Sequence, residues 1–331
     1  MKEIISLLTD RRAAGSTPGA RSDGRFVALV IEGGAMRGVV SAGMVAALEQ
    51  MGLRSSFDAI YGSSAGAIAG AYFAAGQATY GTTMFYEDLN NTLFIDLKRL
   101  LFGKPVVSLE YLFEDVCTSR KPLSFENLRA SGIELNAVAA SISLQKAVSF
   151  NDFQTREELL TVLKASSRIP FFAGPPVSFR DDTFLDASLY ESIPYLTALA
   201  DPRVTDIVVL LTRPRGTYRS EPNPVDRWIV APYLGRMSPV LQQHYMERAE
   251  EYKHELVELD SLASHGNDKG QNALVIQVPP DGVNVGSLEK RRDVLVQGAL
   301  SGFRAVVEVF DDTPRHYLET IGTYPSLVTV R

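Results

Sequence analysis

One local pattern occurs twice between residues 25 and 76: a short apolar run, a cluster of glycines, and a run with helical spacing. The first copy is RFVALVIEGG followed by VVSAGMVAALEQMGL, and the second is FDAIYGSSAGAIAGAYFAAG. Short, continuous β-branched runs are typical of parallel strands that are buried on both faces. Strands that alternate with helices predict an α/β fold built around a mostly parallel central sheet.

Later segments extend this pattern and divide the chain. ELNAVAASIS, AVSF, DIVVLLTRP and NALVIQVPP are typical of strands, and REELLTVLKASSR of a helix that ends before Pro170. Two long amphipathic segments, SPVLQQHYMERAEEYKHELVELDSLAS and VGSLEKRRDVLVQGALSGFRAVVEVF, lie in the last third. We therefore expect a flexible N-terminal lead-in over residues 1–25, a main domain over 26–214, and a helical C-terminal extension over 215–331 that packs on the sheet.

Charge and cysteine content narrow the class of protein. The net charge of the chain is −6, whereas nucleic-acid-binding proteins present a basic face, so no nucleic-acid partner is expected. The single cysteine, Cys117, excludes an intrachain disulfide and suits a reducing compartment.

The first 25 residues lack the apolar core of a signal peptide. No run reaches the roughly 18 apolar residues of a membrane span. We expect a cytoplasmic protein, and peripheral contact with membranes stays open.

The glycine cluster of the second copy surrounds two serines. In GSSAG, Ser64 lies at the centre of a G-x-S-x-G motif, whereas Ser63 does not. A serine between a strand and a helix can be held on a strained turn with its hydroxyl exposed, and the flanking glycines avoid clashes there. Ser64 is therefore a candidate nucleophile. The alternative is tight packing of a helix whose glycines recur every four residues.

The first glycine cluster, IEGGAMRGVVSAG, also lies between an expected strand and an expected helix. Backbone N–H groups in such a loop can bind a phosphate or an oxyanion. The glycine spacing does not match the dinucleotide-binding pattern G-x-G-x-x-G, and the chain has no G-x-x-x-x-G-K-[ST] motif. An oxyanion hole is the favoured interpretation, with Arg37 fixing the loop or adding positive potential. A tight turn alone is the alternative.

A serine nucleophile needs a group that accepts its proton. His244, His254, His265 and His316 all lie in the C-terminal third, where we expect solvated side chains. The chain has no H-E-x-x-H motif and no cysteine cluster, so neither a metal nor a cofactor is expected. In FRDDTFLDASLYESIPY, Asp186 follows apolar residues at an expected strand end, where desolvation raises the basicity of a carboxylate. Asp186 is therefore the candidate base.

Three short motifs follow one another along the chain: EGGAMRG, GSSAG and DAS. In this order they resemble the patatin-like phospholipase family, whose pattern is a D/E-G-G-G-x-R-G loop, then G-x-S-x-G, then D-G-[GA]. KASSRIPFFAGPPV also resembles the apolar segment that usually precedes the catalytic aspartate of the family. The resemblance covers roughly residues 26–214, and it implies a three-layer α/β/α fold.

The resemblance also implies an activity: a serine acyl hydrolase of the lipase or phospholipase type that cleaves carboxylic esters of lipids without a cofactor. Carried over by motif position, Ser64 is the nucleophile and Asp186 is the base of a dyad without histidine. The reaction would pass through an acyl-Ser64 intermediate. The oxyanion hole would be formed by backbone N–H groups around Gly33, Gly34, Arg37 and Gly38.

Two departures from the family pattern keep other functions open. Ala35 replaces the third glycine of the loop, and Ala187 replaces the glycine after the aspartate. An alanine held at a positive φ costs roughly 1 kcal/mol or more. A weakly active or inactive lipid-binding protein on the same fold is therefore the alternative, and a histidine-dependent α/β-hydrolase is a third hypothesis.

Two basic segments bear on the substrate. NTLFIDLKRLLFGKPVVSLEYLF, residues 91–113, mixes large apolar residues with three cations, which suits a lid or a patch that meets a bilayer. An ordinary helix packed on the sheet is the favoured alternative. The arginines Arg213, Arg215 and Arg219 suit anionic headgroups, although a solvated loop is the favoured interpretation.

Overall fold

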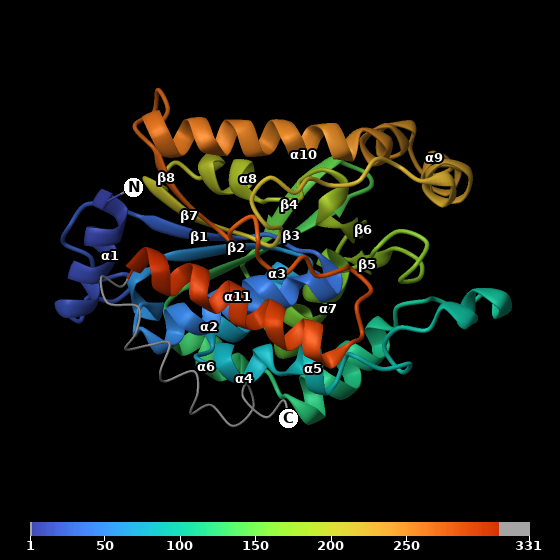
Figure 1. Cartoon of the computed structure of the whole chain (residues 1–331), viewed down its shortest axis with the longest axis horizontal. Coiled ribbons are helices and arrows are strands. Elements are labelled where there is room, and N and C mark those ends of the chain that lie inside the picture. Colours follow the sequence, from blue (N-terminus) through green and yellow to red (C-terminus); the bar gives the residue numbers. More distant parts are fainter. Residues whose placement is uncertain (1, 311–331) are drawn as a thin grey trace.

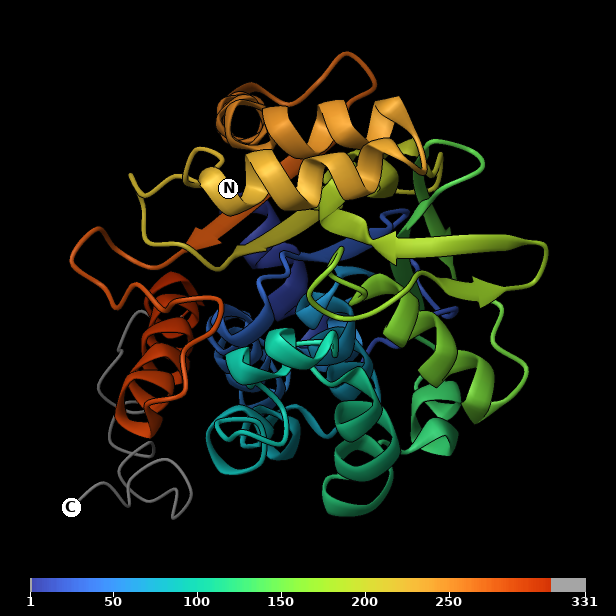
Figure 2. The ribbon, with the colours of Figure 1, turned by 90° about the vertical axis from the view of Figure 1, so that its right-hand side faces the viewer.

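The central sheet lies between two layers of helices in the computed structural model, which describes residues 2–310 (Figures 1 and 2). Within these residues the sheet has eight strands in the order β5-β6-β3-β2-β1-β7-β8, and β4 pairs with β3 outside this path. The strands are β1 (Val27–Ile31), β2 (Ala59–Ser63), β3 (Glu134–Ser141), β4 (Lys146–Phe150), β5 (Val177–Phe179), β6 (Asp182–Asp186), β7 (Asp206–Leu211) and β8 (Asn272–Gln277). The predicted three-layer α/β class is confirmed.

The middle of the sheet is parallel, as predicted. β1 pairs with β2 and β7, β2 pairs with β3, and β7 pairs with β8, all in parallel, whereas β4, β5 and β6 join as antiparallel strands. Ile31 at the end of β1 is the register partner of Gly62 near the end of β2. Because parallel strands present their carboxyl ends at one edge of a sheet, the glycine loop after β1 and Ser64 after β2 emerge side by side.

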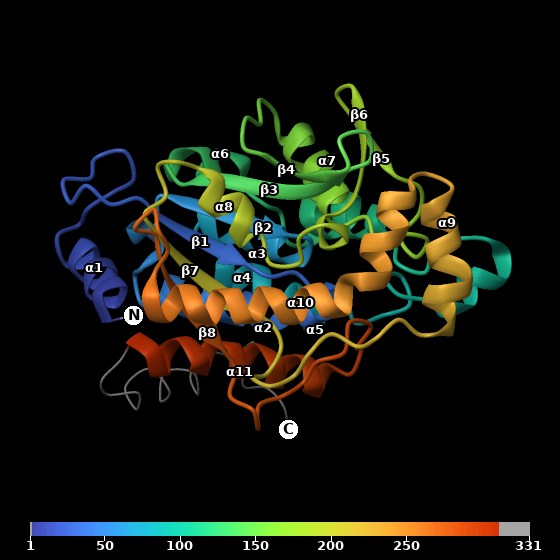
Figure 3. The same cartoon turned by 90° about the horizontal axis from the view of Figure 1, so that it is seen from above.

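Helices cover both faces of the sheet. α8 (Tyr195–Ala200) and α10 (Pro239–His265) lie over one face, above the sheet in Figure 1 and in front of it in Figure 3. α2 (Val39–Gln50), α3 (Ala65–Ala74) and α11 (Arg292–Phe310) lie under the other face, on the largest apolar cluster. Further α-helices are α4 (Ala78–Thr82), α5 (Met84–Glu87), α6 (Phe125–Ala130), α7 (Arg156–Ser166) and α9 (Ala231–Gly235). No helix within residues 2–310 is long and apolar enough to cross a bilayer.

The C-terminal extension shares both sheet and core with the main domain. β8 adds a parallel strand beside β7, and its buried side chains belong to the same apolar clusters as those of β1. α11 packs closely on α2: a Cβ added to Gly43 would lie 2.1 Å from the carbonyl oxygen of Ala299, and one added to Gly302 would lie 2.0 Å from that of Val40. Only glycine lets the two backbones approach so closely. The boundary at residue 214 stays a prediction.

The flexible lead-in predicted over residues 1–25 is wrong for the part that the structure describes. Helix α1 (Lys2–Ala13) turns Ile4, Leu8 and Arg11 inward, and at most 2% of each of these residues is exposed. The three positions are four and three residues apart, the spacing of one helix face. The charged and Gly/Pro-rich sequence that follows them obscured this short apolar stripe.

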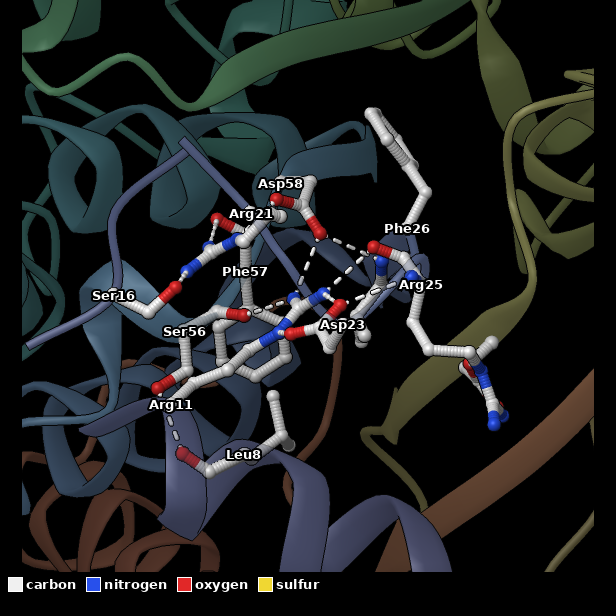
Figure 4. A network of polar contacts seen from close by, with 12 residues as sticks. Leu8, Arg11, Ser16, Arg21, Asp23, Arg25, Phe26, Ser56, Phe57 and Asp58 are labelled. Atoms are coloured by element: carbon white, nitrogen blue, oxygen red, sulfur yellow. Dashed lines mark hydrogen bonds and ion pairs between the residues drawn. The ribbon is translucent and has the colours of Figure 1, made fainter. Parts of the chain in front are cut away.

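A buried ion cluster holds this N-terminal segment against the start of the sheet (Figure 4). Asp58, directly before β2, accepts hydrogen bonds from Arg11 Nη1 at 2.8 Å and from Arg21 Nε at 2.7 Å. The same carboxylate accepts the N–H of Val27, the first residue of β1, at 2.8 Å. Arg11 also hydrogen-bonds to Asp23, which lowers the pKa of that carboxyl to about 2. Because buried charges persist only when they are paired, the cluster fixes α1 to the base of β1 and β2.

Candidate active site

Ser64 occupies a strained turn between β2 and α3. Its backbone has φ 54° and ψ −125°, a conformation that residues with side chains rarely adopt, and α3 begins at the next residue. A Cβ added to Gly62 would lie 2.5 Å from the Cα of Ala67, and one added to Gly66 would lie 2.3 Å from the carbonyl oxygen of Ile31. The flanking glycines therefore permit both the turn and the close packing of α3 on the strands.

A serine from α7 braces the turn. The Ser64 N–H donates to Ser166 Oγ at 2.8 Å, and Ser166 Oγ donates to the carbonyl oxygen of Val138 in β3 at 2.5 Å. Neighbouring Ser63 is fully buried, and its hydroxyl has no hydrogen-bond partner among residues 2–310. No motif in the sequence predicts the brace, because Ser64 and Ser166 are 102 residues apart.

The glycine loop, the segment between β1 and α2, is pressed against this turn. A Cβ added to Gly33 would lie 2.4 Å from the carbonyl oxygen of Ser63 and 2.8 Å from the Cβ of Ser64. At the other end of the loop, a Cβ added to Gly38 would lie 2.5 Å from the Cβ of Ala65. Two of the predicted oxyanion-hole glycines therefore contact the turn that carries Ser64, and neither position has room for a side chain.

Ala35 stands in the left-handed region that favours glycine, with φ 52°. An alanine in this conformation destabilises the loop by roughly 1 kcal/mol relative to glycine. Ala187 is not among the residues with positive φ, so the second departure from the family pattern carries no such strain. Of the two alanines, only Ala35 bears on the geometry of the loop.

The N–H groups of the loop divide into paired and unpaired donors. The Arg37 N–H donates to the carbonyl oxygen of Gly34 at 3.1 Å, and the Met36 N–H donates to the carbonyl oxygen of Ser287 in the C-terminal extension at 3.1 Å. The N–H groups of Gly33 and Gly34 have no acceptor in the part of the chain that the structure describes. The backbone of Arg37 is thus engaged within the loop, while Gly33 and Gly34 retain free donors.

The carboxylate of Glu32 anchors the base of the loop to the end of β7. It accepts hydrogen bonds from the Thr212 N–H at 2.5 Å, from the Thr212 hydroxyl at 2.8 Å and from Arg213 Nη1 at 2.7 Å. Arg37 Nε donates to the Thr212 hydroxyl oxygen at 3.1 Å, so its side chain also fixes the loop. Burial, followed by repulsion from Arg213, lowers the pKa of Arg37 to about 10. Arg213 is a buried partner of Glu32, and the solvated position favoured for it from the sequence is wrong.

Asp186 is the last residue of β6, and only 3% of it is exposed. Its Oδ1 accepts the N–H of Ser188 at 3.0 Å. Strand β3 lies between Asp186 and the serine turn, because its Ala139 is the register partner of Asp186 and its Val138 is the register partner of Ser63. Burial raises the pKa of Asp186, while the hydrogen bonds from Ser188 and Ser64 and the charge of Arg219 partly offset this effect. The fold therefore brings the two central residues of the sequence prediction into one buried site.

Arg219 supplies a positive charge beside Asp186. Its Nη1 donates to Ser192 Oγ at 2.8 Å. Burial, followed by repulsion from Arg248, lowers the pKa of Arg219 to about 10, and the neighbouring Asp186 carboxylate acts in the opposite direction. Arg219 is therefore partly buried next to the site, whereas Arg215 is exposed, as predicted for a solvated loop.

The histidines are remote from this site. His244, His254 and His265 all lie on α10, where His244 pairs with a glutamate and the His254 side chain is 75% exposed. His316 lies outside the described residues. Among residues 2–310, no hydrogen bond or ion pair joins any of these three histidines to Ser64 or Asp186. The described residues therefore favour a carboxylate rather than an imidazole beside Ser64.

Cys117 lies in the π-helix Tyr111–Arg120 and is fully buried. Burial raises the pKa of this thiol to about 12, which makes it a poor nucleophile. Among residues 2–310, no group of three or more histidines, cysteines and carboxylates is arranged to hold a metal ion. Ser64 is thus the nucleophile candidate that the local geometry favours.

An apolar pocket lies beside Ser64. Ala35 and Met36 of the glycine loop line it next to Ser64. Most of the other lining side chains are apolar, among them Ile68, Met84, Phe85, Leu89, Phe94 and Leu112. Apolar walls favour the burial of hydrocarbon, so the lining suits an acyl chain in its chemistry. The cavity measures about 30 Å³, so an acyl chain enters only if these walls move apart.

The fold and the site together define a class of protein: three-layer α/β/α proteins that carry a serine on the turn after a central parallel strand. The family model for patatin-like phospholipase matches residues 29–199, more than half of the chain, and the chain belongs to this family.

Two relatives extend this comparison. An uncharacterized protein of Escherichia coli (strain K12), YjjU, is 29% identical over 224 residues, which cover 66% of this chain and 61% of that protein. Probable lipid hydrolase 463L of Invertebrate iridescent virus 6 is 26% identical over 213 residues, which cover 59% of this chain and 72% of that protein. The chain thus spans less than two thirds of the length of its bacterial relative.

Proposed function

We propose that this protein is a serine acyl hydrolase that cleaves carboxylic esters of lipids, with Ser64 as nucleophile and Asp186 as the base. Membership of the patatin-like phospholipase family supports hydrolysis of lipids. The observation that carries the proposal is that Ser64, on its strained turn, and the buried Asp186 flank the same point of β3, where Val138 and Ala139 are the register partners of Ser63 and Asp186. The apolar side chains beside Ser64 would line the acyl chain once they move apart to admit it.

In the acylation step, Ser64 Oγ attacks the carbonyl carbon of the ester while its proton passes to Asp186. The carbonyl oxygen becomes an oxyanion, which the free N–H groups of Gly33 and Gly34 stabilise. The N-terminal end of α3, directly behind Ser64, adds positive potential at the same place. Asp186 then protonates the leaving oxygen as the carbon–oxygen bond breaks, so that an alcohol departs and an acyl-Ser64 ester remains.

In the deacylation step, a water molecule attacks the acyl carbon and its proton passes to Asp186. The bond to Ser64 Oγ breaks, Asp186 returns the proton to that oxygen, and a carboxylic acid leaves. The raised pKa of Asp186 supports this assignment, because a more basic carboxylate accepts a proton more readily. No cofactor enters either step.

A fluorophosphonate probe tests the proposal, because it forms a covalent bond only with an activated serine and releases fluoride. We expect labelling of the native protein, no labelling of Ser64→Ala, and retained labelling of Ser63→Ala. Ser63 is the matched control, since it is adjacent in sequence but fully buried. Labelling that persists in Ser64→Ala would refute the role of Ser64, and hydrolysis of p-nitrophenyl acyl esters by Asp186→Asn at the native rate would refute the role of Asp186.

The strained Ala35 favours a second candidate, a lipid-binding protein that keeps the fold and has lost efficient chemistry. The strained residue lies in the loop that would hold the oxyanion, so we expect strain to affect turnover more than lipid binding. Lipid retained through purification, together with an unlabelled native protein, would support this candidate over the hydrolase.

A further inference from the structure

Residues 93–107, here called the arm, project from the body of the protein on the same side as α9 (the teal segment at the right in Figures 1 and 3). An antiparallel bridge between Ile95 and Val107 joins the two ends of the arm, and the Val107 N–H donates to the carbonyl oxygen of Phe172 at 3.0 Å. The tip is the short helix Leu97–Phe102. The favoured sequence interpretation, an ordinary helix packed on the sheet, is therefore wrong for this segment.

The tip presents large apolar side chains to solvent. Leu101 is 83% exposed, Phe102 is 75% exposed and Leu97 is 61% exposed, and no residue of the tip helix is buried. Single exposed apolar residues are ordinary on a protein surface, whereas a cluster of them on one projection marks an interaction site. The tip also has a defined conformation, because Arg99 Nη2 donates to the carbonyl oxygens of the preceding turn at 2.9 and 3.0 Å.

Basic side chains accompany the apolar ones. The arm contains Lys98, Arg99 and Lys104 and a single carboxylate, Asp96, a surplus of two positive charges in a chain whose net charge is −6. Lys98 and Lys104 are both exposed. Apolar residues interleaved with lysines and arginines are typical of segments that lie in the interface of a membrane with anionic lipids.

The base of the arm forms part of the wall of the pocket beside Ser64. Phe94 and Val107, on the two sides of the arm, both line that pocket. The exposed apolar tip and the pocket wall therefore belong to one short structure. A partner that binds the tip of the arm is therefore brought close to the pocket beside Ser64, where the acyl chain of a substrate would be held.

We infer that the arm docks on the surface of a membrane that contains anionic lipids. Leu97, Leu101 and Phe102 insert at the boundary between headgroups and acyl chains, and Lys98 and Lys104 contact the headgroups. The inference rests on the proposed function in one respect, because it names the lipid bilayer as the source of the substrate for the Ser64 site.

Two further observations favour a bilayer over a protein partner. The tip is a narrow projection, as Figures 1 and 3 show, whereas a stable protein interface needs a broad complementary surface. Trp228, which is 80% exposed, lies on the short helix directly before α9, at the same end of the molecule as the arm (Figures 1 and 3). Tryptophan is enriched where proteins meet the membrane–water interface.

Sedimentation with vesicles of phosphatidylcholine and phosphatidylglycerol tests the inference. All variants carry Ser64→Ala, so that no lipid is hydrolysed and binding is measured independently of the proposed chemistry. We expect the added pair Leu101→Ser and Phe102→Ser to weaken binding about tenfold or more, because two large apolar side chains no longer enter the bilayer. Val257→Ser is the matched control, since Val257 is 68% exposed on α10 and we expect its loss to leave binding unchanged.

A second set of measurements tests the contribution of charge to vesicle binding. Binding should weaken when phosphatidylglycerol is omitted, when salt is raised, and when Lys98 and Lys104 are both changed to Gln. Native-like vesicle binding by the Leu101→Ser, Phe102→Ser variant, or the absence of vesicle binding by the parent, would overturn the inference. A shift in oligomeric state caused by this double change, with vesicle binding retained, would assign the arm to contact between copies instead. Failure of the proposed hydrolase function appears separately, as loss of fluorophosphonate labelling in the native chain.

Discussion

Gly33 and Ser64 lie so close together that a Cβ added to Gly33 would be 2.8 Å from the Cβ of Ser64. The same added atom would be 2.4 Å from the carbonyl oxygen of Ser63, a backbone atom at the end of β2. The glycine loop and the serine turn therefore fit each other only while residue 33 has no side chain, and this fit packs Gly33, whose N–H is unpaired among the described residues, against Ser64.

We expect Gly33→Ala to lower kcat/KM for p-nitrophenyl acyl esters by about 10²-fold or more, since the loop must move away from Ser64 and its donors move with it. Overpacking should also lower the free energy of unfolding by about 1–3 kcal/mol, measured by urea denaturation. Gly270→Ala is the control: Gly270 has a positive φ, which strains an alanine, but a Cβ there meets nothing within 4 Å, so only stability should fall. Native activity in Gly33→Ala would contradict the fit described here.

Ala35→Gly should stabilise the protein, because glycine adopts a φ of 52° without the strain that alanine bears. The expected gain in the free energy of unfolding is roughly 1 kcal/mol. Ala249→Gly, in the middle of α10, provides a control of opposite sign, because glycine in a helix interior costs about 1 kcal/mol. A loss of stability in both variants would show that Ala35 is not strained.

Asp186→Asn should abolish ester hydrolysis and yet stabilise the fold at neutral pH. Burial raises the folded-state pKa of Asp186 above its unfolded value, so the ionised form is disfavoured in the folded protein at any pH above that value. Asparagine removes this charge at nearly constant shape. Asp182→Asn is the matched control, because burial is outweighed there by hydrogen bonds from Ser141 and Thr183, which hold the pKa of Asp182 low. That substitution should destabilise the protein, and thermal unfolding of both variants distinguishes the two cases.

The rate of ester hydrolysis should fall as the pH falls through the pKa of Asp186, because only the ionised carboxylate accepts the proton of Ser64. The inflection should lie above the ordinary carboxyl value of 3.8, since burial raises this pKa. Arg219→Gln should move the inflection to still higher pH, because the charge of Arg219 lowers the pKa of Asp186. A pH–rate profile of kcat/KM for a soluble ester measures both effects. If Arg219→Gln leaves the inflection unchanged, the charge of Arg219 does not influence the pKa of Asp186.

Asp58→Asn should be strongly destabilising, because it leaves Arg11 and Arg21 buried without their shared carboxylate. Removing one partner of a buried ion pair costs about 3–5 kcal/mol of unfolding free energy. Asp152→Asn is the control, since its ion pair with Arg180 is exposed and should contribute less than about 1 kcal/mol. Similar losses in the two variants, measured by urea denaturation, would count against a structural role for the N-terminal cluster.

The parts of the site that could be predicted from the sequence carry local signals. Ser64 stands between glycines that the strand–helix turn needs, and Asp186 follows an apolar run that ends as a strand. Both signals depend on a few neighbouring residues, and the parallel sheet then brings the two segments to one edge. The sequence predicts the cost of Ala35 if its φ is positive, but it does not predict the sign of φ, because φ depends on how the loop packs.

The residues that hold the site in place could not be predicted, because each acts across a long stretch of chain. Ser166 reaches Ser64 from α7, Thr212 reaches Glu32 from the end of β7, and α1 returns Arg11 to the base of β2. Nothing in the local sequence distinguishes these side chains from ordinary polar residues at the ends of helices and strands. Only the sheet topology determines which of them meet.

The hydrogen bond from the Met36 N–H to the Ser287 carbonyl oxygen makes the far end of the chain a partner of the glycine loop. Shortening the protein to residues 29–199 would remove this acceptor together with β7, the strand that lies alongside β1. The outer edge of β1 would then be bare and prone to pair with other molecules. A minimal fragment cut at the borders of sequence similarity is accordingly no substitute for the intact polypeptide in assays of this fold.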